Sequence, residues 1–100
     1  MRYEDFRRRL VAAVLQTPGD TTPEMRRTAL ERGAAPGSLG PYVSNVARQA
    51  YKITDAEVAQ LRRAGHSDDS LFEITVAAAV GAALHRLDRG MAALCGVEPD

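Results

Sequence analysis

One long helical pattern occupies the last third of this 100-residue chain and limits what the chain can fold into. Ser67 is followed by Asp68 and Asp69, which combines a capping hydroxyl with carboxylates at the positive end of a helix dipole. The next residues, Leu71 to Leu84, are rich in alanine and contain Gly81. Small residues let another helix approach closely, although glycine costs a helix about 1 kcal/mol. We therefore expect a long final helix with a small-residue surface that receives another helix.

The second half of this helix carries a narrow apolar seam. Its residues step by four, three, four and three positions, as in a coiled coil: Val80, Leu84, Leu87, Met91 and Leu94. Such a seam is too apolar to face water on so small a domain. We therefore expect the chain to form a homo-oligomer through the long last helix and its small-residue surface, with Leu84, Leu87 and Met91 at the interface.

Shorter helical segments precede the long one. Apolar side chains recur at helical spacing, and Thr54-Asp55-Ala56-Glu57 is a capping box. The expected helices are Tyr3–Gln16, a short one from Thr22-Pro23 to Gly33, one beginning near Pro41, and Asp55–Ala64. The chain shows no alternating strand pattern, so we predict an all-α compact domain of about five helices with a long C-terminal helix.

The segment 33–41 contains three glycines and two prolines, which break both helix and strand. We interpret 34–41 as a hinge between N-terminal helices in residues 1–33 and a core in residues 42–95. All of these belong to one domain, residues 1–100, because a chain of this length has no room for a second core.

The charge balance and the hydropathy of the chain limit which partners and which cellular location we expect. Thirteen basic and thirteen acidic residues cancel, so no global field attracts nucleic acid or an anionic membrane, and we expect neither as a partner. The Met1 start lacks a secretory signal, and the run Ile74–Leu84 is shorter than the roughly 20 residues that span a bilayer. We therefore expect a cytoplasmic protein.

The candidate reactive residues are few. His66 and His85 are the only histidines, and no metal-binding spacing surrounds them, so we expect no metal and no cofactor. Cys95 is the only cysteine and lies near the C-terminal end of a helix, where the dipole opposes a thiolate. The basic residues fall among acidic ones and are interpreted as solvated helix faces: Arg7, Arg8, Arg9, Arg26 and Arg27.

Residues 63–69 (Arg-Ala-Gly-His-Ser-Asp-Asp), Leu71-Phe72-Glu73 and 76–81 (Val-Ala-Ala-Ala-Val-Gly) resemble the C-terminal part of the alkylhydroperoxidase D-like family, which belongs with the carboxymuconolactone decarboxylases. The resemblance covers about residues 42–94. It implies an all-helical fold that forms dimers, trimers or larger rings, and it allows a related helical protein as a further partner.

The peroxidases of that family carry a Cys-x-x-Cys pair and a histidine, which by the family spacing fall at Ala50, Ile53 and Glu57. The upstream catalytic glutamate falls near Gly37-Ser38-Leu39, where there is no carboxylate. A dithiol peroxidase needs one thiol to attack and another to resolve the sulfenic acid. The resemblance therefore implies a catalytically degenerate oligomer with a structural or regulatory role.

Two enzymatic alternatives remain at this point. An acid–base enzyme of the carboxymuconolactone decarboxylase type, acting on a small organic acid or lactone, could use Tyr51, Glu57 and His66 as pocket residues. An alkylhydroperoxidase that uses Cys95 or a borrowed thiol is the less favoured of the two.

Overall fold

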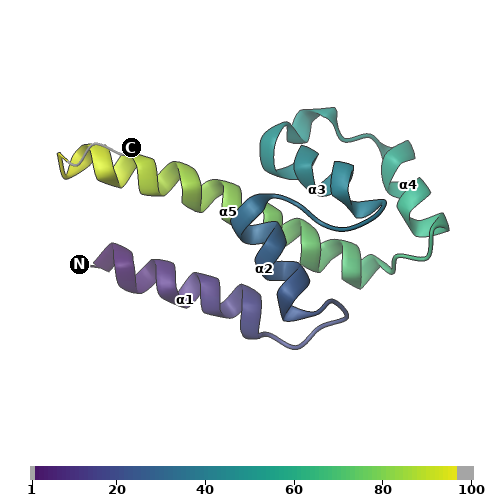
Figure 1. Cartoon of the computed structure of the whole chain (residues 1–100), viewed down its shortest axis with the longest axis horizontal. Coiled ribbons are helices and arrows are strands. Elements are labelled where there is room, and N and C mark those ends of the chain that lie inside the picture. Colours follow the sequence, from purple (N-terminus) through teal and green to yellow (C-terminus); the bar gives the residue numbers. More distant parts are fainter. Residues whose placement is uncertain (1, 97–100) are drawn as a thin grey trace.

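The computed structural model describes residues 2–96, and over them the chain is helical with no strand (Figure 1). Its elements are α1 (Arg2–Gln16), α2 (Pro23–Arg32), α3 (Leu39–Arg48), the 3-10 turn η1 (Ala50–Lys52), α4 (Asp55–Arg63) and α5 (Asp68–Leu94). The predicted all-α class, with a long C-terminal helix, is confirmed.

Three hydroxyl caps begin α2, α4 and α5 where the sequence predicts them. Each of the Thr22, Thr54 and Ser67 hydroxyls accepts a hydrogen bond from the backbone amide three residues later in the chain. The distances are 3.2, 3.2 and 3.0 Å. At the other end of α2, Gly33 adopts the left-handed conformation, with φ 59°, that glycine tolerates best. Capping chemistry therefore sets these boundaries.

The third helix begins close to where the sequence predicts it. It begins at Leu39 and includes Pro41 in its first turn, where amides need no intrahelical partner and proline is tolerated. It ends at Arg48, so Ala50 belongs to η1 and not to the helix. The sequence does not predict this turn, because the helical apolar pattern of Tyr42, Val43 and Val46 continues at Ala50.

The hydrophobic core lies where α2 and α3 pack against the first half of α5 (Figure 1). Val43 of α3 and Ile74 of α5 are fully buried at its centre. Around them lie Ala29, Leu39, Tyr42, Leu61, Leu71, Ala77 and Ala78. The alanine-rich surface of α5 thus receives helices of its own chain, with Gly81 directly against Leu30 of α2.

The molecule extends beyond this core as a two-helix arm, formed by α1 and residues 84–94 of α5, which run antiparallel (Figure 1). The principal extents are 48 × 29 × 18 Å and the radius of gyration is 14.7 Å, against about 13 Å for a compact chain of this length. Most of residues 85–94 are exposed. The arm therefore consists of two helices, whereas a stable helical bundle has about four.

By length and composition alone, α5 could cross a membrane, with a mean hydropathy of 1.3 in its most apolar window. The core helix of a folded domain passes the same test; here Ile74, Ala77 and Ala78 of α5 are fully buried against other helices, while 33% of the apolar window as a whole is buried. The cytoplasmic location stays a prediction.

Candidate functional site

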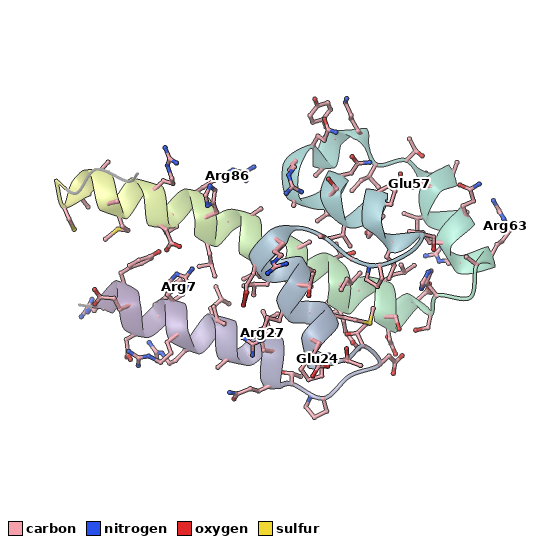
Figure 2. All side chains as sticks on the ribbon, in the orientation of Figure 1. Arg7, Glu24, Arg27, Glu57, Arg63 and Arg86 are labelled. Carbon is pink, nitrogen blue, oxygen red and sulfur yellow. The ribbon has the colours of Figure 1, made fainter. Side chains whose placement is uncertain are left out.

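A polar cluster ties the two helices of the arm together. Arg7 of α1 donates two hydrogen bonds to Asp88 of α5, from Nε at 2.9 Å and from Nη2 at 2.8 Å, and the Tyr3 hydroxyl donates to the same carboxylate. Figure 2 shows Arg7 on the side of α1 that faces α5. The hydrogen bond from Arg7 lowers the pKa of Asp88, and the bond to Asp88 raises the pKa of Tyr3. The cluster fixes the spacing of the two helices.

Apolar side chains on the same arm remain exposed. Phe6 on α1 is 49% exposed, and Leu87 and Leu94 on α5 are 41% and 77% exposed. Leu10 and Met91 are half-buried. Single exposed apolar residues are ordinary, but several on one short pair of helices are typical of an interaction surface.

The predicted interface seam is divided by the fold. Leu84 is only 2% exposed within a single chain, so its side chain contributes to the interior of the monomer. Leu87 and Met91, one and two turns further along, retain accessible surface. The helical period predicts one stripe for these residues, but it cannot show where the covering helices end.

The structure does not bring the predicted pocket residues into a common cavity. Tyr51 lies on η1 and is 83% exposed. The His66 ring pairs with the Ser38 hydroxyl, with 3.1 Å between Nε2 and Oγ. Glu57 on α4 is half-buried, and its Oε1 atom is buried without a hydrogen-bond partner. None of the three lines either cavity described below.

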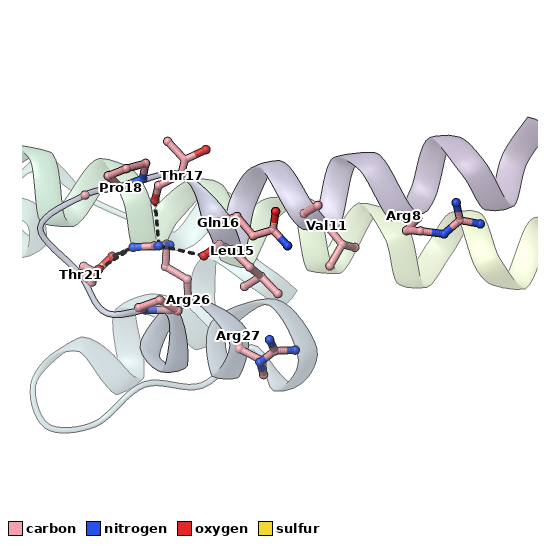
Figure 3. Close-up of a pocket in the computed structure, with 12 residues that line it drawn as sticks. Arg8, Val11, Leu15, Gln16, Thr17, Pro18, Thr21, Arg26 and Arg27 are labelled. Atoms are coloured by element: carbon pink, nitrogen blue, oxygen red, sulfur yellow. Dashed lines mark hydrogen bonds between the residues drawn. The ribbon is translucent and has the colours of Figure 1, made fainter.

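A cavity of about 750 Å³ lies between the end of α1, the loop after it and α2 (Figure 3). At its wall Arg26 is only 4% exposed, which corrects its interpretation as part of a solvated face. Its guanidinium donates to the carbonyls of Val14, Leu15, Thr17 and Thr21 and to the Thr21 hydroxyl. These bonds use all five donors of an arginine, so Arg26 holds the chain turn together and has none left for a ligand.

Glu73 of α5 binds the same loop from the other side. Its carboxylate accepts from the Thr21 amide at 2.8 Å, the Thr21 hydroxyl at 2.6 Å and the Asp20 amide at 2.9 Å, and lies 3.7 Å from Arg26. The Thr21 hydroxyl bond, followed by its amide bond, lowers the pKa of Glu73. Sequence reasoning missed this pairing, since Arg26 and Glu73 are far apart in the chain and neither has a local signal of burial.

A second cavity, of about 500 Å³, lies where the C-terminal ends of α2 and α3 meet the middle of α5. Arginines of all three helices line it: Arg32, Arg48 and Arg86. The residues described by the structure contain no group of three His, Cys, Asp or Glu side chains that could hold a metal ion. Cys95 is exposed at the end of α5.

Comparison with known proteins yields no match to a family model, to a curated protein or to a solved structure. The fold and its surfaces thus define the chain as an all-helical protein with a projecting two-helix arm.

Proposed function

We propose that this protein acts by self-association through its arm, as a catalytically degenerate relative of the alkylhydroperoxidase D-like proteins with a structural or regulatory role. One observation carries the proposal: Phe6, Leu87 and Leu94 are exposed on the arm, which projects beyond the core that α2 and α3 form with α5.

A pair of helices buries too little apolar surface to be stable on its own, and bundles reach stability with about four helices around a common core. The arm of a second copy supplies the missing two. A two-fold arrangement places the same surface on both copies, so every exposed apolar side chain of one arm gains a counterpart. Fully burying a leucine or phenylalanine side chain is worth about 1.5–3 kcal/mol, and these side chains are already part-covered.

The polar cluster supports the same proposal. Arg7 and Asp88 hold α1 and α5 together before any partner arrives, and a preorganised surface loses less conformational entropy on association. The two side chains are 39% and 40% exposed, so their ion pair contributes little to monomer stability. Its main effect is to set the geometry of the apolar surface.

The acid–base alternative has less support. It gains from the buried, unpartnered Oε1 of Glu57, which is an unusual state for a carboxylate. It loses because Tyr51 is 83% exposed and His66 is paired with Ser38, so neither of the two predicted partners joins Glu57 in a cavity.

Sedimentation or light scattering on the purified chain tests the proposal. The wild-type protein should have a mass that is a multiple of 10.8 kDa at micromolar concentration. Phe6→Asp and Leu87→Asp should each dissociate it, because a charge at the centre of a bundle cannot be solvated. A monomeric wild-type protein would contradict the proposal.

Phe72→Asp is the matched control. Phe72 is 68% exposed at the opposite end of α5, outside the arm, and receives the same substitution. It should leave the mass unchanged. If Phe72→Asp dissociated the assembly and the two arm variants did not, self-association would use a different surface.

A further inference from the structure

The 500 Å³ cavity between α2, α3 and α5 is lined by none of the exposed apolar residues proposed for self-association, Phe6, Leu87 and Leu94. In Figure 2, Arg86 projects from the side of α5 that faces away from α1. We propose that this cavity binds a small phosphate monoester, with the phosphate held by arginines and a small apolar group against the cavity floor.

The apolar part of the cavity lining, which we call the floor, comes from all three helices. It consists mainly of small residues: Ala29 and Leu30 of α2, Ala47 of α3, and Ala78, Gly81 and Ala82 of α5. The close approach of α2 to Gly81 fixes this floor, because a side chain at Gly81 would overlap the Leu30 backbone. The volume falls within the range of about 300–1,000 Å³ that is usual for small-molecule sites.

The rim is basic. Arg32, Arg48 and Arg86 line it together with His85, and the only acidic residue in the lining is Glu31. Glu31 lies 3.6 Å from Arg27, which is not part of the lining, and is thus already paired. Within residues 2–96, Arg32 and Arg86 form no ion pair and their side chains form no hydrogen bond. Two guanidinium groups at one cavity are therefore available to a ligand.

Arg48 supplies a fixed third cation. Its guanidinium donates to the Gly33 carbonyl at 3.1 Å, the Arg32 carbonyl at 3.0 Å and the Ser44 hydroxyl at 3.3 Å. An arginine has five donors, so its Nε–H and one Nη2–H remain unused. The bonds to the last carbonyls of α2 also offset the negative end of that helix dipole, which would otherwise repel an anion here.

The larger cavity does not meet these conditions. Arg26 spends all its donors on the chain itself, Arg8 bonds to Asp5 at 2.9 Å, and Arg27 pairs with Glu31. The larger volume alone would favour that cavity as a ligand site, but the arginines without an ion pair or side-chain hydrogen bond, Arg32 and Arg86, line the smaller cavity.

The charge and shape of the site indicate the ligand class. Guanidinium groups bind phosphate oxygens through paired donors, and a dianion relieves the repulsion between neighbouring arginines. An uncharged ligand would leave these cations unpaired. The alanine floor, in turn, offers apolar contact to the remainder of a small ester.

A titration of the ¹⁵N-labelled protein with phenyl phosphate, followed by amide NMR, tests the proposal. Saturable shifts should map to residues 29–33, 47–48 and 78–86, and inorganic phosphate should shift the same amides more weakly. Benzyl alcohol, which lacks the charge, should shift none of them. Shifts centred on the arginines of α1, or shifts that do not saturate, would overturn the proposal.

Substitutions complete the test. The double variant Arg32→Gln/Arg86→Gln should bind phenyl phosphate at least about tenfold more weakly, since each charged hydrogen bond is worth a factor of this order. Both side chains are exposed and form no ion pair or hydrogen bond within residues 2–96, so the double variant should fold, and a thermal melt checks this. Arg63→Gln removes another exposed arginine, on α4, and should leave binding unchanged (Figure 2). Unchanged binding in the double variant, or equal loss in Arg63→Gln, would contradict a specific site.

Discussion

Gly81 of α5 lies directly against the backbone of Leu30 in α2, so closely that a β-carbon on Gly81 would stand 2.7 Å from the Leu30 carbonyl carbon. The obstacle is backbone, which cannot swing aside as a side chain can. This contact sets the crossing of α2 over α5, and with it the packing of Ala29, Ala77 and Ala78 in the core. A glycine in the middle of a long helix is thus explained by the helix that crosses it.

Gly81→Ala should therefore lower the free energy of unfolding by about 1–3 kcal/mol, because overpacking outweighs the gain in helix propensity. Urea unfolding followed by circular dichroism measures the change. Gly90→Ala is the control in the same helix, where a β-carbon meets nothing within 4 Å, and it should stabilise by up to about 1 kcal/mol. Stabilisation by both substitutions would mean that α2 does not cross α5 at Gly81.

The sequence predicted much of this fold because the signals involved are local. Thr22, Thr54 and Ser67 each cap a helix with a side chain only three residues from the amide that it binds. The alanine-rich surface of α5 was correctly predicted to receive another helix, but it was also expected in the self-association interface, and Ala77 and Ala78 are instead fully buried within one chain. Which helix occupies it could not be predicted, since periodicity describes one face of a helix and not its partner.

Arg26→Lys should lower the free energy of unfolding by roughly 2–4 kcal/mol, even though it preserves the charge. A lysine has three donors on a single nitrogen and cannot reach the four carbonyls that the planar guanidinium serves. Arg27→Lys, one residue on at an exposed position, should change the free energy by less than about 0.5 kcal/mol. Equal effects in the two variants would show that the bonds of Arg26 are dispensable.

The sites were harder to predict than the fold. Arg26 and Arg27 are identical and adjacent, yet one is buried and the other is exposed, because only Arg26 lies over the turn that follows α1. Similarly, Arg32, Arg48 and Arg86 come from three helices and converge only through the tertiary fold. When single polar residues from distant parts of the chain meet in the fold, the sequence contains no periodic pattern that would predict their contact.

Acid should weaken the fold through Glu73. Its pKa is lowered by hydrogen bonds to Thr21, so the folded state binds a proton less readily than the unfolded state. The stabilisation is complete above the unfolded value of about 4.3 and is lost as the pH falls through the lower folded value. Urea unfolding from pH 7 down to pH 3 should show this decline.

Glu73→Gln should reduce the acid-dependent part of the decline and lower stability at neutral pH, because an amide accepts fewer hydrogen bonds from Thr21 and Asp20. Glu24→Gln removes an exposed carboxylate outside this cluster and controls for net charge. An acid profile of Glu73→Gln that overlays that of the wild-type protein would place the effect elsewhere, with Asp88 as the other carboxylate whose pKa is lowered.

The purified protein should not turn over peroxide with a general dithiol reductant, and Cys95→Ser should leave its assembly and ligand binding unchanged. In dithiol peroxidases a thiolate attacks the peroxide and becomes a sulfenic acid, and a second thiol then forms the disulfide and releases water. The resemblance places that cysteine pair at Ala50, on η1, and at Ile53, directly after it. Neither residue has a thiol. Cys95, exposed at the end of α5, could act with a second thiol only if two copies met there with α-carbons within about 7 Å. A peroxide-consumption assay on the wild-type protein and on Cys95→Ser tests this prediction. Turnover that disappears in Cys95→Ser would establish a peroxidase and overturn the degenerate assignment. Turnover that survives the substitution would have to come from another protein or another residue.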